Sequence, residues 1–240
     1  MTLGALEVLL LDAGNTVVFL DMSAVAAVGA ARGISVDAER LARVEGAAKR
    51  RYEATLEGGA SHADGWRLYL VTLLVEAGVD AERADALVEP LREAHETLNL
   101  WRRVPDDLPE ALARARAMGL RIGIVSNSEG RLPELFEHVG LGDAFDVVVD
   151  SAIEGVRKPD PEIFRRACVR MDVEAGAALY AGDIPAVDVD GALRAGLRAA
   201  LIDPYDFYPA HAASARYPSV AALVSALSRS SLGDGDAPTG

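Results

Sequence analysis

Four groups of polar residues follow apolar runs in this sequence, either at the end of the run or, for Lys158, in the loop after the run at 147–149. They are Asp12; Ser126 with Asn127; Lys158; and Asp183 followed by Asp188. Together they supply carboxylates, a hydroxyl and an ammonium group. Mg²⁺ takes one or two carboxylates together with phosphate oxygens and waters, while lysine and serine can neutralise or hydrogen-bond the remaining oxygens. The set therefore indicates chemistry on an anion that is held with a divalent cation.

Each of these residues also has a plain structural interpretation. An aspartate after a strand is a common turn former, and Asp188 at a helix start could be an N-cap worth about 1 kcal/mol. A lone lysine such as Lys158 is usually a solvated surface charge. What favours a site is the order of the residues, because successive strand ends each deliver a group that phosphoryl chemistry needs.

The elements that would position these residues alternate between strand and helix. Short apolar runs predict strands at 8–11, 121–125, 147–149, 177–180 and 199–202, and helical periodicity predicts helices at 108–118, 163–171, 188–195 and 220–227. This alternation predicts an α/β fold with a doubly wound parallel sheet. Ligands of such sheets bind beyond the carboxyl ends of the strands, which is where the polar residues stand.

A long stretch between the first strand and the rest has helical periodicity only. We expect residues 1–20 and 103–232 to form the core and residues 21–102 to form an inserted all-helical domain that acts as a lid. Residues 233–240 combine Gly, Asp, Pro and Thr without periodicity, and we expect them to form a flexible tail.

The composition and charge of the chain limit the kinds of partner that it could bind. The chain has 240 residues, 50% of them hydrophobic, and a net charge of −13, which excludes a mainly disordered chain and disfavours nucleic acid as a partner. No apolar run reaches the ~18 residues of a membrane span, and the start lacks the features of a signal peptide, so we expect no membrane partner and a cytoplasmic location. The single cysteine, Cys168, falls on a helical apolar stripe that predicts a buried structural thiol. The sequence carries no signal of oligomeric state.

Four ordered motifs resemble those of the haloacid dehalogenase-like hydrolase superfamily. They are DAGNT at 12–16, IVSN at 124–127, RKPDP at 157–161, and Gly182-Asp183 with Asp188. The resemblance covers nearly the whole chain, and the inserted helices resemble the family's C1-type cap. It implies a Rossmann-like core, Mg²⁺ as cofactor and, as the commonest activity, hydrolysis of a small phosphorylated metabolite.

The resemblance implies which residues react and which hold the metal. Asp12 would be the nucleophile, which takes a phosphoryl group to form an aspartyl phosphate that water then hydrolyses. Asp12, the backbone carbonyl of Gly14 and Asp183 would hold Mg²⁺. Asp188 would be a further ligand or a partner of Lys158.

It also implies a substrate-binding set. Ser126 and the backbone of Asn127 would bind a non-bridging phosphate oxygen, and Lys158 would steady both Asp12 and the transferring group. Thr16 would orient the loop that follows the nucleophile.

Gly14 is the point of departure from the family pattern. Most phosphatases of the family place a second aspartate two residues after the nucleophile, where it protonates the leaving group. General acid–base catalysis is worth ~10²–10⁴-fold, so its loss would slow such an enzyme without abolishing turnover. A leaving group that needs little protonation, or a substitute acid, would compensate. Asp21 and His62 are candidate substitutes, although an ordinary exposed polar role is favoured for both.

Two other functions stay open. A metal-independent 2-haloacid dehalogenase would use Asp12 as a carbon nucleophile. It fits less well, because Asp183 and Asp188 preserve a cation site and Gly14 stands where such dehalogenases carry an aromatic residue. A catalytically weak binding or regulatory protein, which keeps the fold and the metal, is suggested by Gly14.

Two groups in the insertion could contact an anionic or ring-bearing substrate. One is the basic run at 49–51, and the other combines aromatic and cationic residues at 66–69. We favour a solvated face paired with Glu45 and Glu53 for the first group, and core packing by Trp66 for the second.

Overall fold

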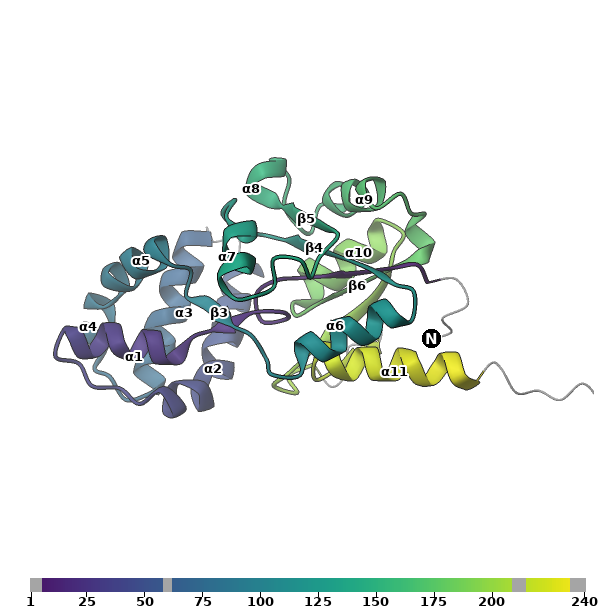
Figure 1. The fold of residues 1–240 in the computed structure, drawn as a ribbon. Helices are drawn as coiled ribbons and strands as arrows, with labels where there is room; N and C mark the ends of the chain where they lie inside the picture. The colour runs from purple at the N-terminus through teal and green to yellow at the C-terminus, as the bar shows by residue number, and fades with distance from the viewer. Residues whose placement is uncertain (1–5, 58–61, 209–214, 234–240) are drawn as a thin grey trace, which may run out of the picture. The chain divides into compact units, whose positions relative to one another are not determined.

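The chain divides into two compact units in its computed structural model (Figure 1), which describes residues 6–57, 62–208 and 215–233, with only the backbone at 56, 57, 62–64 and 230–233. One unit comprises Met1–Phe19 with Arg103–Gly240, and the other comprises Leu20–Arg102. Of the expected tail, residues 234–240 lie outside the described residues. Gly233 does not belong to a tail, because it ends helix α11 (Val220–Gly233).

A six-stranded parallel sheet forms the centre of the first unit. Its strands are β1 (Val8–Leu11), β4 (Arg121–Ser126), β5 (Val147–Asp150), β6 (Ala178–Gly182), β7 (Arg198–Ile202) and β8 (Ala215–Tyr217). Their order is β5-β4-β1-β6-β7-β8, and each neighbouring pair is parallel. From β1, the sheet continues through β4 and β5 on one side and through β6, β7 and β8 on the other. This order confirms the predicted α/β fold with a doubly wound sheet.

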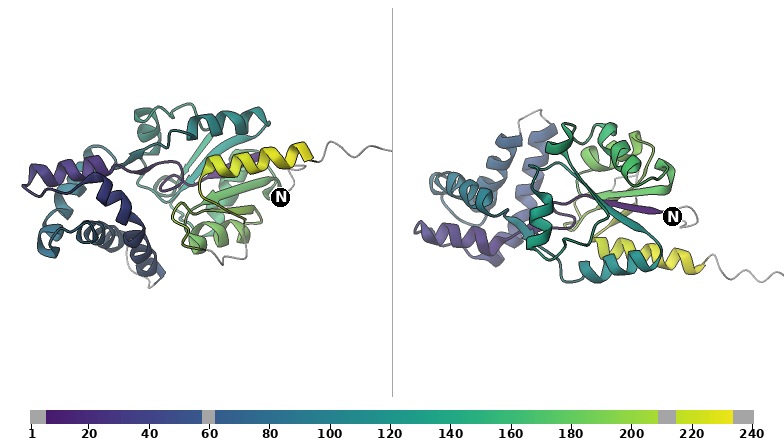
Figure 2. Two further views of the ribbon diagram at one scale, coloured as in Figure 1. Left: turned by 90° about the horizontal axis from the view of Figure 1, so that it is seen from below. Right: turned by 45° about the horizontal axis from the view of Figure 1, so that its top comes forward.

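Helices cover both faces of this sheet (Figures 1 and 2). Helix α11 packs beside α6 (Leu108–Ala117) on one face, and α9 (Pro161–Arg170) packs with α10 (Asp190–Arg194) on the other. The shorter elements are α7 (Leu132–His138), α8 (Ser151–Glu154), the 3₁₀ turn η1 (Ala175–Ala177) and the π-helical turn η2 (Pro185–Val189). The helix expected at 188–195 is therefore divided, because Asp188 lies in η2 and only the later residues form α10.

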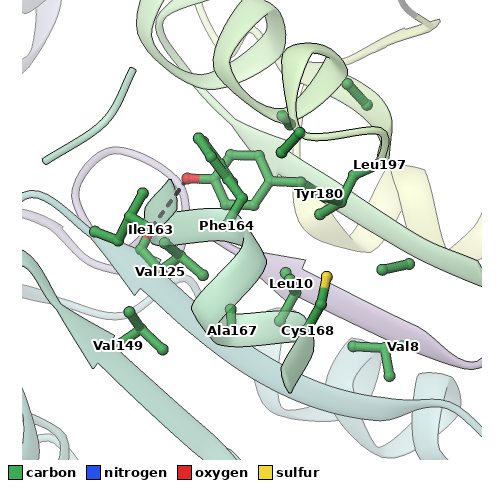
Figure 3. Close-up of a cluster of buried hydrophobic side chains, with 14 of the residues drawn as sticks. Val8, Leu10, Val125, Val149, Ile163, Phe164, Ala167, Cys168, Tyr180 and Leu197 are labelled. Atoms are coloured by element: carbon green, nitrogen blue, oxygen red, sulfur yellow. Dashed lines mark hydrogen bonds between the residues drawn. The ribbon is translucent and has the colours of Figure 1, made fainter. Parts of the chain in front are cut away.

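Strand alternation decides which side chains meet α9. Val8 and Leu10 point to the same face of β1, and both belong to a buried cluster that includes residues of α9 (Figure 3). Cys168 belongs to this cluster too and is 5% exposed. Burial raises the pKa of its thiol, as expected for the predicted structural thiol.

The start of α9 is fixed by local chemistry. The Asp160 side chain accepts a hydrogen bond from the Glu162 N–H at 2.9 Å, and Pro161 occupies the first turn. At Gly191 a β-carbon would lie 2.8 Å from the Phe164 ring, so only glycine lets α10 approach α9 this closely. The loop just before α9 is thereby held in place.

The second unit is built from helices. They are α1 (Met22–Ala31), α2 (Ala38–Glu57), α3 (His62–Glu76), α4 (Ala81–Ala86) and α5 (Val88–Thr97). Among the described residues of 22–100 there is no strand, which matches the expectation. Strands β2 (Phe19–Leu20) and β3 (Trp101–Arg103) form a two-stranded sheet, and both boundaries between the units fall within it.

In the basic run of α2, Arg50 and Arg51 are exposed as predicted, but Lys49 is not. Lys49 is 2% exposed, and its ammonium group lies 3.3 Å from Glu53, one turn further along the helix. Beside it, the Tyr69 hydroxyl donates to the buried Glu45 carboxylate at 3.1 Å. The expected pairing of Lys49 with Glu53 is present. The prediction that Lys49 is solvated was wrong, because apolar periodicity does not detect a charged side chain that is buried together with its partner. Trp66 packs against the core of the unit as predicted.

The structure describes the side chain of one of the two candidate substitute acids, Asp21. Asp21 caps α1 by accepting from the Ala24 N–H at 3.1 Å, and it forms an ion pair with Arg102 at 2.9 Å. These contacts give Asp21 a structural role. The side chain of His62 lies outside the described residues.

Candidate active site at the carboxyl edge of the sheet

Asp12 stands at the carboxyl end of the central strand. Its backbone N–H donates to the Ala181 carbonyl at 2.9 Å, which continues the β1 ladder by one residue. The register pairs Leu11 with Ile124 of β4 and with Ala181 of β6. Asp12 therefore lies between the ends of both neighbouring strands.

Three carboxylates gather at this edge. Each of Asp12, Asp183 and Asp188 offers one oxygen, and these oxygens all lie within 4.8 Å of one another. All three residues are buried, with exposures of 8%, 2% and 1%. Hard oxygen donors in such a group suit a small divalent cation. The Cβ that a side chain at Gly182 would carry lies 2.5 Å from the Asp188 Cγ, so glycine there makes room for this carboxylate.

The ammonium group of Lys158 is embedded in the same cluster. Its Nζ lies 2.7 Å from Asp12 Oδ1 and 2.7 Å from Asp188 Oδ1. It also donates a hydrogen bond to the Tyr180 hydroxyl at 2.8 Å. Lys158 is 5% exposed, so the solvated surface charge that a lone lysine usually represents does not apply here.

The electrostatics of the cluster favour an added positive charge. Burial raises the pKa of Asp12 to about 7; the Lys158 charge opposes this rise, and the Asp188 and Asp183 charges add to it. Burial alone would lower the pKa of Lys158, but the carboxylates of Asp12 and Asp188 outweigh it, and the pKa is raised. One ammonium group thus shares a buried space with three carboxyl groups, and a divalent cation would balance the excess negative charge.

The loop after β4 is tied to Lys158. The Asn127 carboxamide donates from Nδ2 to the Lys158 carbonyl at 2.9 Å and accepts from the Lys158 N–H at 2.8 Å. The Asn127 side chain is therefore engaged by the Lys158 backbone, and the role of the Asn127 backbone in binding a substrate stays a prediction. Ser126 ends β4, next to β1, and is 4% exposed.

The loop after Asp12 is compact. The Val17 and Val18 N–H groups both donate to the Ala13 carbonyl at 2.9 Å, and Gly14 forms a bridge with Val18. Thr16 is buried, and among the described residues its hydroxyl has no hydrogen-bond partner. Backbone hydrogen bonds therefore shape this loop, and the Gly14 carbonyl stays a predicted ligand.

Sequence reasoning missed two contributors to the site. Asp150 is the last residue of β5, and its carboxylate accepts from the Ser128 hydroxyl at 2.6 Å and from the Gly130 N–H at 2.9 Å, which fixes the loop after β4. The rule that selected Asp12 would have found it, since it is the polar residue after an apolar run. Tyr180 also escaped notice, although a hydroxyl within a buried central strand is itself a signal.

Comparison with known proteins identifies the family. The sequence model of the haloacid dehalogenase-like hydrolases matches residues 6–196. The chain belongs to this family. This haloacid dehalogenase-like hydrolase is 32% identical over 181 residues to haloacid dehalogenase-like hydrolase domain-containing protein 3 of Bos taurus, covering 72% of this chain and 70% of that protein.

A second relative carries a more specific name. The hydrolase is 37% identical over 134 residues to a phosphoserine phosphatase of Thermus thermophilus, covering 54% of this chain and 51% of that protein. The chain thus spans about half the length of this relative. Among solved structures, the magnesium-bound HAD-hydrolase YfnB of Bacillus subtilis has the same fold, with a TM-score of 0.69 and 21% identity over 92% of this chain and 98% of that one. Across the described part of the hydrolase, no helix is long and apolar enough to cross a membrane.

Proposed function

We propose that this hydrolase is a Mg²⁺-dependent phosphatase of a small phosphorylated metabolite that works through an aspartyl phosphate on Asp12. The observation that carries the proposal is the Lys158 ammonium group, which lies 2.7 Å from both Asp12 and Asp188, in a cluster where these two carboxylates and that of Asp183 each have an oxygen within 4.8 Å of the others. The likeness to a phosphoserine phosphatase supports the same activity.

Asp12, Asp183 and Asp188, with the Gly14 carbonyl, would hold Mg²⁺. Their oxygens are the ligand type that this cation prefers, and their buried negative charge exceeds that of Lys158. When bound, the cation supplies positive charge that relieves the repulsion between a carboxylate nucleophile and a phosphate.

In the first step a carboxylate oxygen of Asp12 attacks phosphorus, and the bond from phosphorus to the leaving oxygen breaks. The leaving oxygen takes up a proton, and the phosphoryl group stays on Asp12 as a mixed anhydride. The Lys158 ammonium group stabilises the negative charge of the transferring group, and the Ser126 hydroxyl and the Asn127 N–H donate to its non-bridging oxygens.

In the second step water attacks the phosphorus of the anhydride. The bond between phosphorus and the Asp12 oxygen breaks, inorganic phosphate leaves, and the Asp12 carboxylate is regenerated for the next cycle. Lys158 Nζ lies 2.7 Å from both Asp12 Oδ1 and Asp188 Oδ1, so its positive charge stabilises the Asp12 carboxylate as it forms again.

Gly14 decides which substrates should be tested first. With no carboxyl group at this position, the leaving oxygen depends on its own low basicity or on a proton from elsewhere. A suitable panel therefore combines aryl and acyl phosphates, which have weakly basic leaving groups, with alkyl phosphates, which do not.

The test measures phosphate release from this panel by the wild type and by Asp12→Asn, with Mg²⁺ and after EDTA. We expect wild-type turnover with Mg²⁺, a loss of at least ~10³-fold in Asp12→Asn because the nucleophile is removed, and loss with EDTA that Mg²⁺ reverses.

Three outcomes would contradict the proposal. Hydrolysis that survives in Asp12→Asn would exclude the nucleophile. Halide release from 2-haloacids without metal would identify a dehalogenase. Tight binding of a phosphorylated ligand, with no phosphate released from any member of the panel, would identify a binding protein.

A further inference from the structure

The side chain of Tyr180 lies beneath the catalytic cluster and plays no part in the proposed chemistry. It sits in β6, has 0% exposure, and belongs to the hydrophobic cluster between the sheet and α9. Figure 3 shows its ring among apolar side chains, with the hydroxyl directed toward Val125. A phenol in such surroundings needs partners for its polar end.

The hydroxyl is a junction between three groups. It accepts a hydrogen bond from Lys158 Nζ at 2.8 Å. Its own proton can go to Asp188 Oδ1 at 2.9 Å or to the Val125 carbonyl at 3.0 Å. The hydroxyl thus meets the ammonium group and one of the two carboxylates that this ammonium group contacts.

The ring that carries the hydroxyl is held firmly. Phe164 of α9 meets it edge-on, with the ring centroids 4.9 Å apart at an interplanar angle of 87°. Lys158 Nζ lies 5.4 Å from the centre of the same ring. Because a tyrosine on a central strand has only two side-chain torsions, its oxygen is a fixed point to a good approximation.

Lys158 needs such a fixed point. Its four-carbon stem is flexible, and the two carboxylates of Asp12 and Asp188 attract its ammonium group from equal distances of 2.7 Å. The Asn127 carboxamide fixes only the backbone of Lys158. A third contact to a rigid oxygen defines one position for Nζ between the two acids.

We propose that Tyr180 is a positioning residue whose hydroxyl fixes the Lys158 ammonium group between Asp12 and Asp188. Its effect on turnover rests on the proposed phosphatase function. Its effect on the ammonium group does not, and this can be measured without a substrate.

The sequence makes such a measurement specific. The chain has only two lysines, Lys49 and Lys158. Protein labelled with ¹³C-lysine therefore gives side-chain NMR signals from just two residues, and Lys49, in the other unit, serves as the internal reference.

The experiment compares wild type, Tyr180→Phe and Cys168→Ala in the full chain. Cys168→Ala is the matched control, because Cys168 lies in the same buried cluster as Tyr180. We expect the Lys158 methylene next to Nζ to become more mobile in Tyr180→Phe, while Lys49 keeps its wild-type signal. We also expect kcat to fall about 10- to 100-fold, as for the loss of a hydrogen bond to a charged group, while KM stays within about threefold. Cys168→Ala should leave both readouts unchanged.

The outcomes separate this inference from the proposed function. If Tyr180→Phe melts at a lower temperature but keeps the wild-type Lys158 signal and kcat, Tyr180 is only a packing residue and the inference is overturned. If no variant has turnover but Lys158 loosens in Tyr180→Phe, the positioning role stands and the phosphatase proposal falls. Should Tyr180→Phe fail to fold, Phe164→Leu keeps the hydroxyl but loosens its ring; increased mobility of Lys158 supports the inference, and unchanged mobility overturns it.

Discussion

Lys49 and Lys158 are both buried, one in each unit, but they are held in opposite ways. Lys49 pairs at 3.3 Å with Glu53, which follows one turn later on the same helix. Lys158 contacts Asp12, which follows the first strand, and Asp188, which lies in the turn after β6. The first pair needs only α2 to form, whereas the second needs β1 and β6, which are distant in sequence, to pair side by side.

The comparison distinguishes a lysine that is buried with one carboxylate from a lysine that is buried in a candidate reactive cluster. Beside Lys49 a neighbouring carboxylate offsets the cost of burying the ammonium group. Around Lys158 three carboxyl groups crowd together, and burial raises the pKa of Asp12 to about 7. A fold that maintains such an unfavourable arrangement of charges marks a candidate for chemistry.

Replacing each lysine by methionine tests this difference most strongly. Lys158→Met should lower kcat/KM about 10³-fold or more, because the transferring group loses its cationic partner. Lys49→Met should instead lower the free energy of unfolding by about 3 kcal/mol, since it leaves a buried carboxylate without its ion pair, and kcat should stay within about tenfold. Phosphate release and urea unfolding of both variants measure the two effects. Loss of turnover in Lys49→Met as complete as in Lys158→Met would erase the distinction.

Gly182→Ala tests how tightly the cluster is built. Its β-carbon would lie 2.5 Å from Asp188 Cγ and 2.8 Å from Oδ1, so this carboxylate has to move. We expect the Mg²⁺ concentration for half-maximal activity to rise about tenfold, with a loss of 1–3 kcal/mol in stability, about the range for overpacking. Gly176→Ala is the control, because nothing lies within 4 Å of a β-carbon at Gly176. Equal Mg²⁺ requirements in the two variants would speak against Asp188 as a ligand.

Asp160→Ala should have the smallest effect. This aspartate is near Lys158 in sequence, but its carboxylate caps α9 through the Glu162 N–H. Loss of the cap should cost about 1 kcal/mol in urea unfolding and leave kcat unchanged, and Asp160→Asn should restore the stability. A large fall in kcat would show that Asp160 belongs to the reactive group of aspartates rather than to the structural ones.

Much of the core unit could be predicted from the sequence, because its strands appear as apolar runs and its site residues appear in order near the ends of those runs. The run 8–11 forms β1, and the polar residues at the ends of β1, β4 and β6 mark one edge of the sheet. The two- and three-residue strands β2, β3 and β8 are too short to produce an alternating pattern.

The contacts within the site were less predictable, because they depend on neighbours that are distant in sequence. The burial of Lys49 follows from packing between helices, which hydrophobic periodicity does not describe. The junction at the Tyr180 hydroxyl requires the loop that carries Lys158 to lie over β6. Pattern analysis can select residue types near a strand end, but it cannot assign their hydrogen bonds.

The pair of hydrogen bonds from the Asn127 carboxamide to the Lys158 backbone couples two segments. A shift of the loop after β4 would therefore also move the Lys158 backbone, and the two segments behave as one rigid part of the site. Engineering that reshapes one segment for a bulkier ester would therefore have to redesign both together.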